Sequence, residues 1–254
     1  MASNDVRFAT APYVYITDHD GTVTDRDSND TATDDLGFGP EKRRALNVQI
    51  LNGEIGFRDA FRMMLDSISD NGHDFESVKA YLVKHIGLDP GFKGFLEWSK
   101  QHNLPIVIVS SGMKPIIEAC LINLIGAEDT AKIEIIANDV EILEGGKWRI
   151  VFRHEDSPFG HDKSRSTAAY RALAHRPTLF FSGDGVSDLS AAKATDCLFV
   201  KVIPGHTNDL KVHCDREQIP HIPFEHFGEV KEVVERVIVG GNSIKAELAK
   251  GATK

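Results

Sequence analysis

Short apolar runs recur along the chain, and each is followed at once by a polar turn that contains glycine. Three of them, at residues 13–17, 105–110 and 178–182, lead into the turns DHDGT, SSGMK and GDGVSD. Runs of this length are typical of buried parallel strands, and each turn here is followed by a helical pattern. This order predicts an α/β fold with an open, Rossmann-like parallel sheet and three polar turns at one edge. A run at 197–202 extends the sheet.

The long stretch between the first two predicted strands has a helical pattern. Pro40 fits the first turn of a helix that continues to Leu51, and residues 57–68 and 75–86 repeat apolar side chains at helical spacing. We therefore expect a small helical cap at 24–89, inserted after the first strand. The core domain would comprise 1–23 and 90–254, and the hinges would lie near Thr24 and at 89–91.

The remaining pattern predicts a hairpin, a helix and a loose end. Two extended runs within 133–153 flank a Gly145-Gly146 turn, which indicates a β-hairpin. Residues 227–239 have the apolar spacing of an amphipathic helix. The polar tail at 245–254 is expected to fray.

Composition narrows the class of protein. The chain has 254 residues, 41% of them hydrophobic, which is enough for a large core. Its net charge of −9 argues against nucleic-acid partners and anionic membranes. Three widely spaced cysteines without a CxxC motif suit a reduced compartment, and no run is long enough for a membrane span or signal peptide. We expect a cytoplasmic protein, a monomer by default.

The turn after the first strand gathers carboxylates. Asp18 and Asp20 are two apart, so in an extended segment both side chains point the same way and His19 points oppositely. Two adjacent carboxylates indicate either a divalent metal or a carboxyl with a raised pKa. Asp184 and Asp188, after a neighbouring strand, add two acids at the same edge. Several oxygen ligands with room for a phosphate suit Mg²⁺.

The second turn suits an anion. Ser110, Ser111 and Gly112 offer a hydroxyl and backbone N–H groups before a predicted helix, and Lys163 precedes another helical stretch. A metal, an anion cradle, a lysine and a spare carboxylate are the parts that phosphoryl transfer needs. The residues alone also allow plainer interpretations: a solvated acidic loop, a serine helix cap and a surface lysine.

The motifs DHDGT, VIVSSG, DKS and GDGVSD resemble, in order and spacing, the four motifs of the haloacid dehalogenase-like phosphatases. The position of the helical insert resembles the first cap class (C1) of that superfamily. The similar branch is the phosphoserine-phosphatase-like one. Within it, stretches such as LGFG, DPGFK and SPFGHDKSRS are similar to fungal phosphatases of polyol phosphates.

The resemblance implies roles for the acids. Asp18 would be the nucleophile that forms an aspartyl-phosphate, and Asp20 would be the general acid and base. Asp18, the main-chain carbonyl of Asp20, and Asp184 would hold Mg²⁺, with Asp188 either a direct ligand or one water away.

The resemblance also implies a phosphate site and shows two departures. Ser110, Lys163 and the N–H groups near Gly21 and in the Ser111-Gly112 pair would hold the phosphate. Ser187 replaces an asparagine common in the phosphoserine branch, and His19 replaces an apolar residue. We expect His19 to affect packing rather than chemistry.

Met64 bears on the substrate. It aligns with a cap arginine that reads the substrate carboxylate in the phosphoserine branch, and a thioether cannot bind a carboxylate. This favours a neutral, hydroxylated leaving group. Six residues are predicted to lie near the substrate: Asp27, Ser28, Asn29, Asp30, Lys114 and Ser187. The plainer interpretation of 27–30 is a turn with a helix cap.

The sequence therefore predicts a Mg²⁺-dependent phosphomonoesterase of small metabolites, with polyol phosphates as the favoured substrates. Phosphoserine, phosphoethanolamine and methylthio-sugar phosphates are alternatives that differ in the charge of the leaving group. A receiver-like signalling module, in which phosphorylated Asp18 is a long-lived mark, is an alternative from another class. Asp20 argues against that module, because a built-in base shortens the life of the phosphoaspartate.

Overall fold

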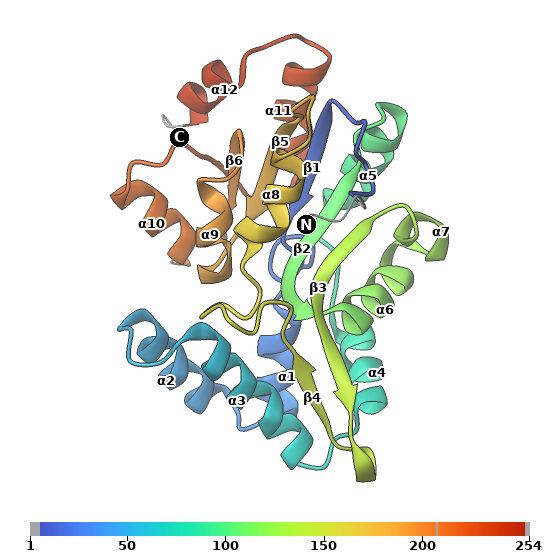
Figure 1. Ribbon diagram of the computed structural model, residues 1–254, viewed down its shortest axis with the longest axis vertical. Helices are drawn as coiled ribbons and strands as arrows, with labels where there is room; N and C mark the ends of the chain where they lie inside the picture. The colour runs from blue at the N-terminus through green and yellow to red at the C-terminus, as the bar shows by residue number, and fades with distance from the viewer. Residues whose placement is uncertain (1–5, 207, 252–254) are drawn as a thin grey trace.

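A single seven-stranded sheet forms the centre of the protein, seen in a computed structural model that describes residues 6–206 and 208–251 (Figure 1). The strand order is β4-β3-β2-β1-β5-β6-β7, and only the β3–β4 pair is antiparallel. The strands are β1 (Tyr13–Thr17), β2 (Ile106–Met113), β3 (Glu134–Ile142), β4 (Trp148–Val151), β5 (Thr178–Gly183), β6 (Cys197–Lys201) and β7 (Ile222–Phe224). The predicted open parallel sheet is confirmed.

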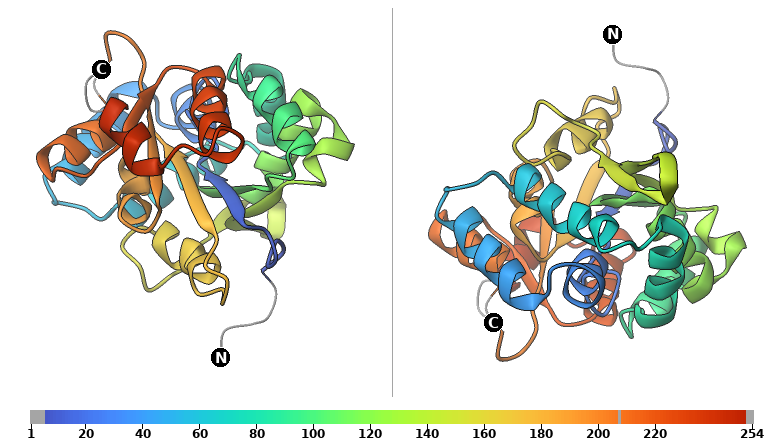
Figure 2. Two further views of the ribbon diagram at one scale, coloured as in Figure 1. Left: turned by 90° about the horizontal axis from the view of Figure 1, so that it is seen from above. Right: turned by 90° about the horizontal axis from the view of Figure 1, so that it is seen from below.

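Helices cover both faces of this sheet, which explains why its central strands are apolar without alternation (Figure 2). One face packs on α5 (Phe92–Gln101), α6 (Lys114–Ile125) and α11 (Phe227–Ile238). The other face packs on α8 (Lys163–Arg171), α9 (Leu189–Ala192) and α10 (Asp209–Arg216). The short elements are α7 (Ala127–Thr130), α12 (Ile244–Gly251), η1 (Glu144–Gly146) and η2 (Val186–Asp188).

The direction of the winding reverses at β1. The chain passes from β1 to β2 and β3 on one side, then returns to β5 on the other side of β1. Ligands of open α/β sheets bind in the crevice beyond the strand ends at such a switch point. The turns that follow β1, β2 and β5 meet there.

A helical layer lies beyond the carboxyl ends of these strands, at the bottom of Figure 1. It consists of α1 (Ser28–Leu36), α2 (Pro40–Leu51), α3 (Phe57–Asp70) and α4 (Phe75–His85). The last three agree with the predicted helices, whereas α1 was not predicted. Thr24 and Leu88 pair in an isolated bridge where the chain leaves and re-enters the core. The division at 23/24 and 89/90 stays a prediction that this bridge supports.

The β3–β4 hairpin fastens this layer to the sheet. Trp148 is buried and its ring lies edge-on to Phe75 of α4, with 5.5 Å between ring centres. Its backbone N–H donates to Ser69 Oγ at 3.1 Å, and its indole N–H donates to the carbonyl of His73 at 2.9 Å. The apolar core of the helical layer is therefore continuous with β4 and α6.

Two expectations about local structure are wrong. β2 continues to Met113 through a register shift that begins after Val109, so the SSG stretch is irregular strand rather than turn. The tail is helical from Ile244 to Gly251, because the buried Glu247 carboxylate accepts hydrogen bonds from Arg236 and Asn242. The rest of that prediction, at 252–254, lies outside the described residues.

All three cysteines are buried and unpaired, as expected of small core residues. No helix within 6–206 or 208–251 combines the length and apolar character needed to cross a bilayer.

Candidate active site

The turn after β1 carries the first two acids. The strand ends at Thr17, and the N–H groups of Thr22, Val23 and Thr24 all point at the carbonyl of His19. Because the chain is no longer extended, the side chains do not alternate. His19 Nδ1 therefore lies 3.3 Å from Asp20 Oδ1, and the prediction that His19 faces away from the aspartates is wrong for Asp20.

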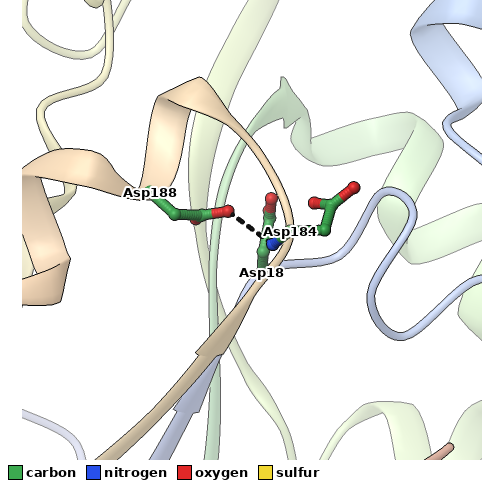
Figure 3. Close-up of side chains that lie close together, drawn as sticks. All are labelled: Asp18, Asp184 and Asp188. Atoms are coloured by element: carbon green, nitrogen blue, oxygen red, sulfur yellow. Dashed lines mark hydrogen bonds between the residues drawn. The ribbon is translucent and has the colours of Figure 1, made fainter. Parts of the chain in front are cut away.

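Three carboxylates converge on one point beyond the sheet (Figure 3). Asp18, Asp184 and Asp188 each place an oxygen within 4.8 Å of the others. The second oxygen of Asp188 accepts the N–H of Asp184 at 3.0 Å, which is the dashed line in Figure 3. Gly21, at φ +68°, makes room for this cluster, since a Cβ there would lie 2.5 Å from Asp184 Oδ2.

One cation is buried among these acids. Lys163, the first residue of α8, is 0% exposed, and its Nζ lies 2.8 Å from Asp18 Oδ1 and 2.6 Å from Asp188 Oδ1. Asp162 caps the helix by accepting the N–H of Ser164, which fixes where Lys163 emerges. Lys163 thus lies behind the Asp18 carboxylate, and its predicted contact with phosphate stays a prediction.

A single lysine does not neutralise three carboxylates. Burial and the charge of Asp188 raise the pKa of Asp18 to about 7, although Lys163 works in the opposite direction. Burial and the charges of Asp18 and Asp188 likewise raise the pKa of Asp184. A buried oxygen cluster with surplus negative charge is the donor set of a hard divalent cation, so these residues fit Mg²⁺.

Asp20 is held differently from this trio. Burial opposes its ionisation, but the neighbouring His19 ring and the hydrogen bond from Ser28 outweigh it and lower the pKa of Asp20. Its carboxylate accepts the backbone N–H of Ser28 at 2.9 Å and the Asn29 side-chain amide at 3.1 Å. Two acids two positions apart therefore have opposite pKa shifts, because Asp18 lies in a cluster of like charges and Asp20 is surrounded by hydrogen-bond donors.

The irregular end of β2 faces the acids with hydrogen-bonding groups. The Gly112 N–H donates to Ser110 Oγ at 3.0 Å. The buried Ser111 Oγ has no partner among the described residues, which leaves a hydroxyl free for a ligand. His161 Nδ1 donates to the carbonyl of Ser110 at 2.6 Å and holds this segment from below.

These groups line one cavity of about 170 Å³ between the sheet and the helical layer. Ten predicted site residues line it: Asp18, Asp20, Asp27, Asn29, Asp30, Ser110, Ser111, Gly112, Asp184 and Ser187. Gly21, Lys163 and Asp188 lie beneath its floor, and Ser28 contributes its backbone N–H to Asp20.

The structure places Lys114 away from the cavity. It was predicted to lie near the substrate, but it opens α6 facing Glu118, with 3.7 Å between the charged groups, and lines a separate groove. The strand continues three residues further than expected, which carries Lys114 past the cavity.

The helical layer supplies cavity residues that sequence reasoning missed. Asn47, Ile50 and Leu51 come from α2, and Phe57 and Phe61 come from α3. Met64, predicted as core, is buried in the apolar cluster and lines the cavity as well. The signal for α3 was present, because Phe57 and Phe61 share a helical face with Met64. The sheet domain adds Val186 and Asp209, for which the sequence carried no signal.

The described lining of the cavity beyond the acid trio is polar in part but has no free cation. Among the described residues that line it, none is Lys, Arg or His. Burial and neighbouring acids raise the pKa of Asp27, and burial raises that of Asp30 to about 6. Arg43 of α2 binds Asp30 from outside at 2.5 Å. Both carboxyls are therefore easier to protonate than a free aspartate, and Asp30 is in addition paired with Arg43.

Comparison with known proteins agrees with this geometry. The model of the haloacid dehalogenase-like hydrolases matches residues 16–193. Polyol phosphate phosphatase PYP1 of Saccharomyces cerevisiae is 44% identical over 243 residues, 92% of this chain and 97% of that protein. Pdp3-interacting factor 1 of Schizosaccharomyces pombe is 43% identical over 227 residues, 89% and 95% of the two chains.

A solved structure supports the fold. A phosphoserine phosphatase, studied as an analogue of its phospho-aspartyl intermediate, superimposes with a TM-score of 0.58 at 16% identity, covering 75% of this chain and 87% of that one. The sheet, the acids at its edge and these matches lead to one conclusion: the chain belongs to the haloacid dehalogenase-like hydrolase family.

Proposed function

We propose that this protein is a Mg²⁺-dependent phosphomonoesterase of small cytoplasmic metabolites, and that polyol phosphates are its substrates. The observation that carries the proposal is the content of a single cavity. It holds Asp18, Asp20 and the hydroxyls at the end of β2, and the rest of its described lining combines apolar side chains with Asn47, Asp27 and Asp30 but contains no Lys, Arg or His. A relative that aligns along almost its full length is a polyol phosphate phosphatase by name.

The chemistry proposed for Asp18 and Asp20 is a double displacement. An Asp18 oxygen attacks phosphorus as the bond to the leaving oxygen breaks, and Asp20 gives that oxygen a proton. Asp20 then takes a proton from the water that attacks the aspartyl-phosphate, which frees phosphate and restores Asp18. The raised pKa of Asp18 belongs to the metal-free cluster, and a divalent cation beside it would favour the ionised carboxylate that attack requires.

The negative charge of the phosphate has to be balanced by positive charge and hydrogen-bond donors at the site, because the protein is acidic overall. Mg²⁺ held by Asp18, Asp184, the carbonyl of Asp20 and Asp188 would supply positive charge beside the phosphate. The free Ser111 hydroxyl, together with Ser110 and the backbone at Gly112 and Gly21, would bind its oxygens. Lys163, paired with Asp18 and Asp188, keeps positive charge directly behind the nucleophile.

The far end of the cavity supports a neutral, hydroxylated leaving group. A phosphoserine carboxylate would meet Asp27 and Asp30 with no lining cation to bind it. The carboxyls of Asp27 and Asp30 can accept hydrogen bonds from hydroxyls, and the amide of Asn47 can both donate and accept them. The apolar side chains of Phe57 and Phe61 suit the carbon chain of a polyol. Asp27, Ser28, Asn29, Asp30 and Ser187 stay predictions as substrate contacts.

The test is phosphate release from a panel of polyol, sugar, serine and ethanolamine phosphates, with and without Mg²⁺. Wild type and Asp18→Asn are compared side by side. We expect metal-dependent turnover that is fastest with a polyol phosphate and abolished in the variant. Preference for phosphoethanolamine would show that the acids of the cavity bind a cation. A stable phosphoprotein without turnover would replace the enzyme by the signalling module.

A further inference from the structure

The first helix of the cap begins directly against the proposed acid and base. Ser28 N–H donates to Asp20 Oδ1 at 2.9 Å, and Asn29 Nδ2 donates to Asp20 Oδ2 at 3.1 Å. Each donor takes a different oxygen, so together they fix the plane of the Asp20 carboxyl. Both groups are buried, and Asn29 is only 7% exposed.

The Asn29 side chain is itself held in place. Asp27 caps α1 by accepting the N–H groups of Asn29 and Asp30 at 2.7 and 2.9 Å. One turn later, Thr33 Oγ1 donates to the carbonyl of Asn29 at 2.8 Å. The backbone that carries the amide is therefore rigid at both its N–H and its carbonyl.

The opposite wall is shaped to admit this contact. A Cβ on Gly112 would lie 2.9 Å from Asp20 Oδ2 and 3.5 Å from Asn29 Nδ2. A side chain larger than hydrogen would displace the Asp20 carboxyl from this position. Gly112, in the irregular end of β2, thus leaves the space in which Asp20 meets Asn29.

We propose that Asn29 is a positioning residue for Asp20, rather than a reader of substrate hydroxyls as the sequence predicted. This inference rests on the proposed phosphatase function. The carboxyl of Asp20 must deliver its proton to the leaving oxygen along one direction as the P–O bond breaks, and the amide of Asn29 sets that direction. Because Asn29 belongs to the cap and Asp20 to the core, the Asp20 carboxyl is fully oriented only when α1 packs against the core.

If Asn29 positions Asp20, the loss of activity on replacing Asn29 should depend on how much the leaving group needs a proton. An alkoxide leaves poorly and needs the proton, whereas p-nitrophenolate leaves well without one. The quantity kcat/KM reports the steps up to departure of the leaving group, so later hydrolysis of the aspartyl-phosphate does not obscure it. A hydroxyl reader would instead matter only for substrates that carry hydroxyls.

The experiment compares Asn29→Ala with wild type on a polyol phosphate, n-propyl phosphate and p-nitrophenyl phosphate at saturating Mg²⁺. We expect kcat/KM to fall about 10- to 100-fold for both alkyl phosphates and to change little for the aryl phosphate. Asn29→Asp, which keeps the size of the side chain but loses the donor, should give the same pattern. Thermal unfolding of both variants checks that they fold.

The control is Asn47→Ala, which removes another amide from the same cavity. It should leave the ratio of n-propyl to p-nitrophenyl phosphate turnover at the wild-type value. A loss in Asn29→Ala confined to the polyol phosphate would identify Asn29 as a hydroxyl reader and overturn the inference. An equal loss on all three substrates would also overturn it. No phosphate release by wild type would overturn the proposed function first, and the inference with it.

Discussion

Replacing the proposed nucleophile is expected to stabilise the metal-free protein while abolishing its activity. Asp18 lies among Asp184, Asp188 and Lys163 and is 5% exposed. Its ionisation in the folded state is disfavoured by burial and by Asp188, which raise its pKa from 3.8 to about 7. Asp18→Asn removes the charge and keeps the shape, so the repulsion disappears.

The pH dependence fixes the sign and the size of the effect. A carboxyl with a raised folded-state pKa costs stability as pH rises from its unfolded value to its folded value, and the cost is constant above that. A rise from 3.8 to about 7 corresponds to about 4 kcal/mol above pH 7, and to about 1–2 kcal/mol at pH 5. The gain from Asp18→Asn should therefore be about 2–3 kcal/mol larger at pH 8 than at pH 5.

Thermal unfolding in EDTA measures this directly. For a chain of this size each kcal/mol moves the midpoint by about 2–4 °C, so a gain of about 4 kcal/mol should place the midpoint of Asp18→Asn at pH 8 about 8–16 °C above that of wild type. Asp70→Asn is the control, because its side chain is 69% exposed and should give no such gain. Equal midpoints at pH 8, or a gain that does not depend on pH, would refute the electrostatic argument.

Three further predictions follow from the metal site, the hairpin and the C-terminal helix. Chelation should stop phosphate release, Mg²⁺ should restore it, and added Mg²⁺ should raise the melting temperature of wild type more than that of Asp18→Asn. Trp148→Ala should lower the free energy of unfolding in urea by about 3–5 kcal/mol, because it empties the junction between hairpin and cap. Burial opposes ionisation of Glu247, but hydrogen bonds from Lys250, Asn242 and Arg236 outweigh it and lower the pKa to about 2. Its stabilisation is full above about pH 4.5 and lost towards pH 2, so Glu247→Gln should cost about 1–2 kcal/mol at pH 7 in urea unfolding and nothing near pH 2.

The residues at the carboxyl edge of the sheet were predictable because each strand and the polar motif after it can be recognised from neighbouring residues alone. A buried strand followed by DHDGT, SSG or GDGVSD can be recognised within ten residues, and topology then brings the strand ends together. No long-range information was needed to place Asp18, Asp184 and Asp188 in one group. The error at His19 came from extending strand alternation beyond Thr17, where the strand ends.

The lining from the cap was not predictable in the same way. The pattern of α2 fixes a helix but not its rotation, since Leu46 is its only buried residue. Whether Asn47 and Ile50 face the cavity depends on how the cap packs on the sheet domain. That packing is fixed in part by Trp148, about a hundred residues later in the chain, which contacts the cap. The prediction for Lys114 depended on a turn after Ser110, whereas β2 continues through a register shift to Met113.

The polar run at 27–30 was predicted to bind substrate hydroxyls, and its contacts in the structure suggest a different role. Two interpretations competed there, hydroxyl readers or a helix cap, and the cap is what Asp27 forms. Asp27 Oδ1 accepts two backbone N–H groups and the Asn29 amide donates to Asp20, so both side chains already serve the helix start and the acid. The start of the cap is therefore suited to orienting Asp20. The residues that discriminate among leaving groups are then those of α2 and α3. Substitutions at Asn47 and Phe57 should then reorder the substrate panel, whereas those at Asn29 should slow every alkyl phosphate alike.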